Sequence, residues 1–231
     1  MPNVAPNLVE NLARVQQRIR TAEQYYGRTP NAVHLLAVSK MHPAEMVAAA
    51  AAAGQTCFGE NYLQEAEDKI QALSTAGLEW HFIGPIQSNK THRIAELFDW
   101  VHSVDRLKIA RRLNDQRPAE RPPLNICLQV NISAEASKSG LTPDELPAVA
   151  AAVAQLPRLR LRGLMAIPAP TADFEQQRRS FQSVRQLQQQ LQQTGLQLDT
   201  LSMGMSDDLE AAIAEGATWV RIGTAIFGPR Q

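Results

Sequence analysis

Short apolar runs rich in Val, Ile and Leu recur along the chain, and longer stretches separate them. Continuous apolar runs of this kind, bounded by turn residues, are typical of buried strands. The stretches between them carry apolar residues every three or four positions, which is typical of amphipathic helices. We therefore expect eight strands, at residues 33–40, 56–61, 78–84, 100–105, 125–131, 159–167, 199–206 and 218–225.

The expected helices begin and end with recognisable residues. The segment 43–54 starts with proline and ends with glycine, the usual asymmetry of helix termini. In 142–156, Thr142 is the expected N-cap and Pro143 stands in the first turn. The glutamine-rich segment 173–195 keeps an apolar stripe, so we interpret it as a half-exposed helix. Two further helices are expected at 61–73 and 90–99.

Alternation of strands with helices predicts a parallel sheet, because parallel neighbours need crossover connections. Eight such units in 231 residues indicate an α/β protein, a single-domain (β/α)₈ TIM barrel over residues 1–231. No helix is expected after the eighth strand. An additional N-terminal helix at about 7–26 is expected to cover that gap. An open doubly wound sheet is the alternative, but the sequence lacks the common glycine-rich nucleotide-binding motifs that would favour it.

Composition narrows the class of partner. The 23 basic and 23 acidic side chains cancel, which gives no support for binding a nucleic-acid backbone or an anionic membrane. The first twenty residues contain no secretory signal, and no apolar stretch is long enough to span a bilayer, so we expect a cytoplasmic protein. Cys57 and Cys127 lie in expected strands without metal-ligand spacing, and we expect buried free thiols.

Candidate chemistry is expected where the strands end, because functional groups of such barrels gather at that face. His81 lies a few residues inside the third run. Neither a set of metal ligands with the usual spacing nor a serine nucleophile motif is present. The strand ends supply Ser39, Lys40, Glu60, Asn61, Ile83, Gly84, Asp105, Asn131, Met165, Ser206, Arg221, Ile222, Gly223 and Thr224.

The ends of the seventh and eighth strands resemble an anion site. Ser206 is the expected N-cap of the following helix, and Gly223 and Thr224 stand just beyond the eighth strand. Backbone N–H groups, a hydroxyl and a close-approach glycine can together hold a phosphate, and barrels often bind one here. The alternative is that Ser206 only caps its helix and Gly223 only relieves packing.

Lys40 ends the first strand, which barrel closure places beside the eighth. Burial disfavours its charged ammonium, and the free amine is a nucleophile that forms imines with aldehydes. An aldehyde that carries a phosphate fits this arrangement, and pyridoxal 5′-phosphate (PLP) is the obvious candidate. Arg221 would then face the pyridine nitrogen and keep it unprotonated, which weakens the ring as an electron sink. The alternatives are a solvated Lys40 and a surface ion pair at Arg221.

Several segments together resemble the pyridoxal phosphate homeostasis proteins, small single-domain relatives of the alanine racemase N-terminal barrel (fold type III of PLP proteins). The resemblance extends over nearly the whole chain. The segments that carry it are "LLAVSK", "FGENYLQE", "EWHFIGPIQSNK", "VNISAEASKSG", "RGLMAI", "LSMGMSDD" and "RIGTAIFG".

The resemblance implies that Lys40 carries PLP as an imine. It also implies that the phosphate is held by Ser206, Gly223 and Thr224, that Arg221 faces the ring nitrogen, and that the pocket is lined by Asn61, His81 and Met165. Lys138 matches a second lysine of the family that could bind the cofactor; the alternative interpretation is that Lys138 is an ordinary loop lysine. Lys90 is a weaker candidate for such a lysine.

A carrier is favoured over an enzyme. Racemases of this type add a second domain and a tyrosine base, whereas this chain ends at Gln231 and Tyr25, Tyr26 and Tyr62 lie on expected helices. A racemase needs a base on each face of its substrate, and one is missing here. We therefore expect a non-enzymatic monomer that holds PLP for homeostasis of vitamin B6 and hands it to PLP-dependent acceptor enzymes. The alternatives are a PLP-dependent racemase or decarboxylase, and a cofactor-free aldolase or isomerase of phosphorylated sugars.

Overall fold

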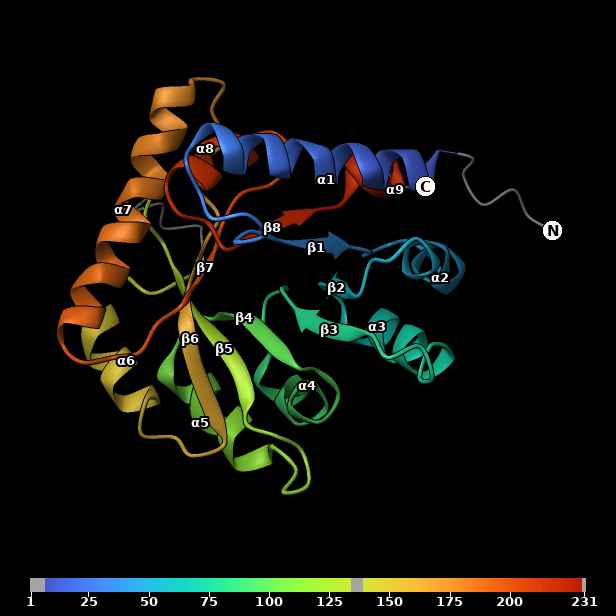
Figure 1. The fold of residues 1–231 in the computed structure, drawn as a ribbon. Coiled ribbons are helices and arrows are strands. Elements are labelled where there is room, and N and C mark those ends of the chain that lie inside the picture. Colours follow the sequence, from blue (N-terminus) through green and yellow to red (C-terminus); the bar gives the residue numbers. More distant parts are fainter. Residues whose placement is uncertain (1–6, 134–138, 230–231) are drawn as a thin grey trace.

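A closed barrel of eight parallel strands forms the centre of the computed structural model, which describes residues 7–133 and 139–229 (Figure 1). The strands follow one another around the barrel in chain order, and β8 pairs with β1 to close it. All eight strands expected from the apolar runs are therefore confirmed. Their bounds are β1 His34–Val38, β2 Cys57–Glu60, β3 Glu79–Phe82, β4 Trp100–Val104, β5 Leu124–Val130, β6 Leu159–Ala166, β7 Thr200–Ser202 and β8 Trp219–Ile222.

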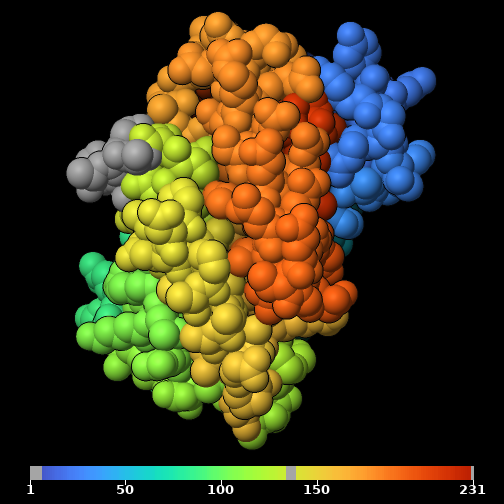
Figure 2. Space-filling view, turned by 90° about the vertical axis from the view of Figure 1, so that its left-hand side faces the viewer, coloured from blue at the N-terminus to red at the C-terminus, as the bar shows by residue number. Residues whose placement is uncertain are grey.

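Helices follow the strands and form the outer ring. Figure 2 looks onto one side of this ring, where α7 crosses the middle of the surface and α1 lies at one edge. Asp173 caps α7 by accepting a hydrogen bond from the backbone N–H of Gln176. The bounds are α1 Leu8–Tyr25, α2 Ala44–Ala52, α3 Leu63–Ala72, α4 Thr91–Leu97 (after the short 3₁₀ helix η1 Ser88–Lys90), α5 Leu107–Gln116, α6 Leu146–Val153, α7 Phe174–Gln193, α8 Leu209–Ala214 and α9 Thr224–Phe227.

Two expectations about helix positions were wrong. Helix α6 begins at Leu146, later than expected, although Thr142 makes the expected capping contacts: its hydroxyl accepts from the Glu145 N–H, and the Glu145 carboxylate accepts from the Thr142 N–H. A helix also follows β8, the four-residue α9.

The N-terminal helix α1 covers the closure of the barrel, as expected. It contacts α8, α9 and α2, and Figure 1 shows it lying along β1 and β8. Its buried apolar stripe contains Leu8, Leu12, Val15 and Ile19. Because α9 is only one turn long, α1 supplies the apolar surface that a full last helix would otherwise provide. Within the described residues, no helix combines the length and apolar character needed to cross a bilayer.

Candidate functional site

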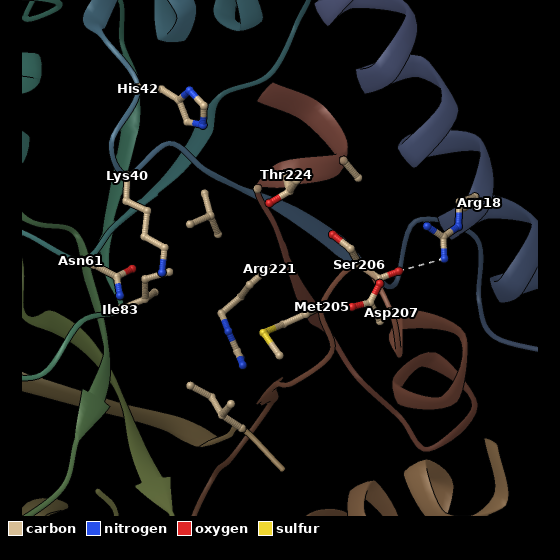
Figure 3. Close-up of a pocket in the computed structure, with 14 residues that line it drawn as sticks. Arg18, Lys40, His42, Asn61, Ile83, Met205, Ser206, Asp207, Arg221 and Thr224 are labelled. Carbon is tan, nitrogen blue, oxygen red and sulfur yellow. Dashed lines mark hydrogen bonds between the residues drawn. The ribbon is translucent and has the colours of Figure 1, made fainter. Parts of the chain in front are cut away.

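A cavity of about 610 Å³ opens at the carboxyl ends of the strands, a volume within the range of small-molecule sites. In Figure 3, Lys40 and Asn61 lie on one side of it, Ser206 and Thr224 lie on the other, and Arg221 lies between them. Six of the predicted site residues are therefore brought together. The lining consists of Arg18, Val38, Lys40, His42, Asn61, Ile83, Ile167, Met205, Ser206, Asp207, Arg221, Gly223, Thr224 and Ala225.

Lys40 is half-buried, and hydrogen bonds anchor the backbone on both sides of it. The Lys69 ammonium donates to the Ser39 carbonyl at 2.8 Å, and it also pairs with Glu60 at 2.7 Å. Ser39 in turn donates its hydroxyl to Glu60 at 2.6 Å. On the other side, the N–H of Met41 donates to the Glu65 carboxylate at 2.8 Å. The end of β1 is therefore fixed by a buried ion pair.

Arg221 extends from β8 into the barrel and is 5% exposed. Its Nη1 donates to the Ser202 carbonyl at 2.6 Å and to the Ser202 hydroxyl at 2.8 Å. Its Nη2 donates to the Ala166 carbonyl at 2.9 Å. Burial lowers the pKa of Arg221 to about 10, and the Asp208 carboxylate opposes that effect. The guanidinium therefore remains a cation at neutral pH, and it is not a surface ion pair.

Ser206 does not cap the helix that follows it, contrary to expectation. It lies in a turn, α8 begins at Leu209, and the Asp208 carboxylate accepts from the Met205 N–H at 2.6 Å. Residues 206–208 form a tight turn and are therefore not part of the first turn of α8. Ser206 is nevertheless in the cavity lining, on the same side as Thr224 and opposite Lys40.

Gly223 stands where β1 and β8 approach each other at the cavity. A Cβ at this position would lie 3.0 Å from the Val38 carbonyl oxygen and 3.4 Å from the Val38 Cβ. Neither backbone can retreat easily, because Val38 ends β1, Gly223 directly follows β8, and these two strands are paired. The absent side chain therefore lets the chain between β8 and Thr224 pass close to the end of β1, which is a packing role.

Arg18 and His42 line the cavity but were missed by the sequence reasoning. Arg18 comes from α1, donates to the Ser206 carbonyl at 3.1 Å and pairs with Glu210 at 2.9 Å (Figure 3). His42 stacks on Phe227 with ring centroids 5.1 Å apart. The helical spacing of apolar residues in α1 places Arg18 on the polar face of this helix, but it does not show which residues that face contacts. His42 lies just two residues beyond Lys40, which was the signal available for it.

Asn61 connects the cavity to a second one of about 350 Å³, which Asn61, Ile83 and Ile167 also line. Among the described residues, the buried Oδ1 of Asn61 has no hydrogen-bond partner. Ser139 belongs to the second cavity, whereas Lys138, the second candidate lysine, lies outside the described residues.

The structure does not place His81 and Met165 in the cavity lining, contrary to expectation. Met165 is 1% exposed and packs with Trp100 and Cys127 inside the barrel. His81 is fully buried and hydrogen-bonds to other polar side chains. Both lie one layer below the cavity, since residues of one strand that point inward occupy successive layers of a barrel.

The remaining candidates lie away from the cavity. Lys90 ends η1 and is not among the residues lining either cavity. Tyr62 precedes α3 and is 51% exposed, and Tyr25 is 80% exposed on α1. The thiols are free, as expected, although Cys57 is only partly buried. Burial raises the pKa of Cys57 to about 11 and that of Cys127 to about 12, so both thiols are protonated at neutral pH.

Comparison with known proteins identifies the family. The alanine racemase N-terminal domain family matches residues 11–231. A pyridoxal phosphate homeostasis protein of Pseudomonas aeruginosa is 66% identical over 224 residues, covering 97% of this chain and 96% of that one. One from Escherichia coli is 58% identical over 233 residues, with 97% of each chain covered. The structure of PipY from Synechococcus elongatus with PLP bound is 38% identical and superimposes with a TM-score of 0.84, covering 96% of this chain and all of that one. The chain therefore belongs to the alanine racemase N-terminal domain family and, within it, to the pyridoxal phosphate homeostasis proteins.

Proposed function

We propose that this protein binds PLP covalently through Lys40 and contributes to PLP homeostasis as a carrier, without catalytic turnover. One observation carries the proposal: an amine, a buried guanidinium and two hydroxyls from three separate segments of the chain meet in one cavity. The homeostasis proteins and the PLP-bound PipY structure support PLP as the ligand. The bound cofactor supplies an aldehyde that condenses with a primary amine and releases water.

The residues present fit the groups of PLP. Ser206, Thr224 and the N–H groups near Gly223 would hold the phosphate, and Arg18 adds positive charge on that side. Lys40 on the opposite side would meet the aldehyde. The unsatisfied Oδ1 of Asn61 is an acceptor that a ligand donor can satisfy.

Arg221 would face the ring nitrogen as a donor. A guanidinium has no lone pair to accept a proton, so it leaves that nitrogen unprotonated. An unprotonated ring withdraws electrons weakly, which disfavours carbanion chemistry. Among the described residues that line the cavity there is no tyrosine, and besides Lys40 the available acid–base groups are His42 and Asp207. These features support a carrier over a racemase or decarboxylase.

We further propose that the carrier works in the cytoplasm as a monomer and hands PLP to PLP-dependent acceptor enzymes. The exposed Met41, Tyr62, Ile167 and Met205 follow strand ends at the cavity face and offer apolar surface for transient contact with an acceptor. Size-exclusion chromatography with light scattering tests the monomer, and transfer of PLP to an apo-enzyme across a dialysis membrane, compared with transfer in mixture, tests direct contact.

The absorption spectrum of the purified protein with PLP tests the binding proposal. We expect a visible band that borohydride abolishes, with the reduced cofactor mapped to Lys40. Lys40→Ala removes the band, whereas Lys90→Ala, a half-buried lysine outside the cavity, retains it. A full band in Lys40→Ala would contradict the assignment and direct the mapping to Lys138.

Isotope exchange tests the absence of turnover. The loaded protein is incubated with L-alanine in D₂O, and the α-deuterium content and the D-isomer are measured. We expect neither above the level given by free PLP. Exchange that depends on Lys40 would instead establish a racemase-type enzyme.

A further inference from the structure

A continuous series of hydrogen bonds runs through the barrel interior from the amino-terminal face to the cavity. We name its members, Glu79, His81, His102, Ser202 and Arg221, the buried network; the last four are buried, and the Glu79 side chain at its outer end is 42% exposed. His81 Nε2 lies 2.8 Å from Glu79 Oε1, and His81 Nδ1 lies 2.9 Å from His102 Nε2. His102 Nδ1 lies 2.7 Å from the Ser202 hydroxyl, to which Arg221 Nη1 donates at 2.8 Å.

The two ends of the buried network fix the direction of its hydrogen bonds. A guanidinium can only donate, so the Ser202 hydroxyl oxygen accepts from Arg221. At the other end, the hydrogen bond from His81 lowers the pKa of Glu79, so this carboxylate is ionised and accepts from His81 Nε2–H.

The two histidines between these ends are neutral. Burial lowers the pKa of His81 and lowers that of His102 well below its usual range, with His81 and Arg221 adding to the effect at His102. Their rings are enclosed by Trp100 and Trp219, at centroid distances of 4.8 to 6.3 Å. A neutral imidazole has one donor and one acceptor. His81 Nδ1 must therefore accept from His102 Nε2–H, and His102 Nδ1 must accept from the Ser202 hydroxyl.

We propose that Glu79, His81, His102 and Ser202 are positioning residues for Arg221, with both histidines held as neutral Nε2–H tautomers. The relation to PLP rests on the function proposed above, but the tautomers do not. Each hydrogen bond points from Arg221 toward Glu79, so the Glu79 carboxylate at the far face of the barrel fixes both tautomers and directs the Ser202 hydroxyl proton to His102 Nδ1, away from Arg221. The network thereby holds the guanidinium in one orientation at the floor of the cavity. His81 acts on the cavity through this series and not by lining it.

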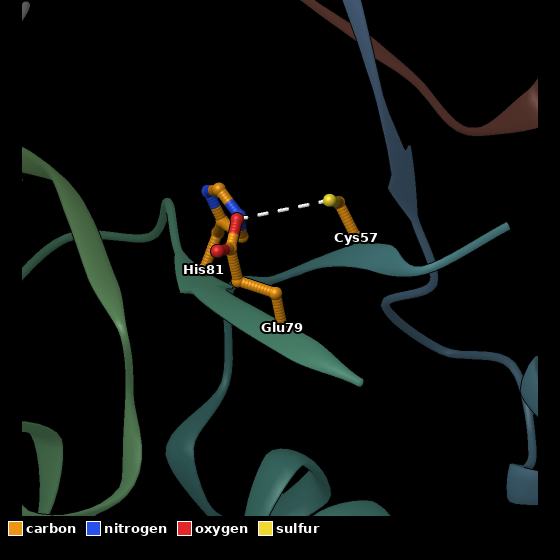
Figure 4. A group of neighbouring side chains, drawn as sticks. All are labelled: Cys57, Glu79 and His81. Carbon is orange, nitrogen blue, oxygen red and sulfur yellow. Dashed lines mark hydrogen bonds and ion pairs between the residues drawn. The ribbon is translucent and has the colours of Figure 1, made fainter. Parts of the chain in front are cut away.

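The far end of the buried network also resembles a metal site. Ligand atoms of Cys57, Glu79 and His81 all lie within 4.8 Å of one another (Figure 4). However, these side chains bond one another, since the Cys57 thiol donates to Glu79 Oε1 at 3.7 Å and His81 Nε2 lies 2.8 Å from the same oxygen. His81 Nε2 cannot both carry the proton for Glu79 and offer a lone pair to a metal ion. Hydrogen bonding accounts for the cluster, and we assign it to the network.

The tautomers are measured by ¹⁵N NMR of the histidine-labelled, PLP-free protein, with signals assigned through His34→Gln, His42→Gln and His92→Gln. We expect His81 and His102 as Nε2–H forms that do not titrate between about pH 5 and pH 8, around the ordinary histidine pKa. Glu79→Gln, whose amide oxygen still accepts, retains both tautomers. Glu79→Leu removes the acceptor and changes the His81 signal. A Nδ1–H form, titration in this range, or loss of the His81 Nε2 proton on adding Zn²⁺ would overturn the proposal.

Cofactor affinity tests the consequence at Arg221. Ser202→Ala removes the hydroxyl that Arg221 and His102 share, and we expect the Kd for PLP to rise about tenfold, as for one lost buried hydrogen bond to a charged group. Thr200→Val, a buried substitution on the same strand outside the network, leaves the Kd unchanged. If wild-type protein binds PLP but Ser202→Ala and Glu79→Leu bind it equally well, the positioning role is wrong and the proposed function stands. If wild-type protein fails to bind PLP, the proposed function is wrong, while the NMR result still decides the tautomers.

Discussion

Lys69→Met should destabilise the protein severely, because it breaks the buried ion pair behind Lys40. The side chains of Lys69 and Glu60 are 6% and 0% exposed, and their nitrogen–oxygen distance is 2.7 Å. Removing one partner of such a pair leaves an uncompensated buried charge, which costs about 3–5 kcal/mol. That is a large share of the total stability of a typical domain, about 5–15 kcal/mol.

The loss of stability caused by Lys69→Met should also depend on pH, and the pKa of Glu60 determines whether this loss grows or shrinks as pH rises. Burial already raises the pKa of Glu60 above its ordinary value, against the effect of Lys69. Without Lys69 the folded-state pKa rises further. A raised carboxyl pKa gives stability that is present below the unfolded-state pKa and lost as pH rises through the folded-state pKa. We therefore expect Lys69→Met to be closer to wild type near pH 4.5 than at pH 7.

Urea unfolding, extrapolated linearly to water at several pH values, measures this cost. Adding Glu60→Gln to Lys69→Met removes the buried charge, so the double variant should be more stable at neutral pH than Lys69→Met alone. Lys108→Met, an exposed lysine on α5, serves as the control and should change stability by no more than about 0.5 kcal/mol. A Lys69→Met cost below about 1 kcal/mol, or one that does not vary with pH, would show that this pair is not electrostatically important.

Three further predictions concern the cavity and the buried network. Gly223→Ala places a Cβ 3.0 Å from the Val38 carbonyl, so PLP affinity should fall at least about tenfold while thermal unfolding shows a folded protein. Unchanged affinity in a PLP titration would contradict the close approach of the two segments. Arg18→Gln should weaken binding of PLP but not of pyridoxal, which lacks the phosphate. The substitution should change stability by only about 0–1 kcal/mol, because the ion pair of Arg18 with Glu210 is about 40% exposed. Equal loss of affinity for both ligands would argue against a phosphate contact. Because the pKa of Glu79 is lowered, mainly by His81, its stabilising contribution is present above the unfolded-state value of 4.5 and is lost as pH falls through the folded-state pKa. Wild-type protein should therefore lose stability relative to Glu79→Gln on acidification below pH 4.5, and parallel denaturation curves for the two proteins would refute this.

The sequence alone determined the barrel and the face at which the candidate site is formed. Apolar runs alternating with helices require parallel strands, and parallel strands joined by crossovers place all their carboxyl ends on one face. For that reason Lys40, Asn61, Ser206, Arg221, Gly223 and Thr224, which span most of the chain, could be predicted to lie close together before their contacts were known.

Only the tertiary structure decided which polar residues reach the cavity. His81 and Arg221 both point into the barrel, yet one lies beneath the cavity and the other lines it, because strand stagger sets the layer of each inward side chain. Arg18 reaches Ser206 through the packing of α1 on α8, a contact between residues 188 positions apart. Local periodicity specifies the face that a side chain occupies, whereas its depth and its partners depend on long-range packing and hydrogen bonds, which a one-dimensional pattern does not record.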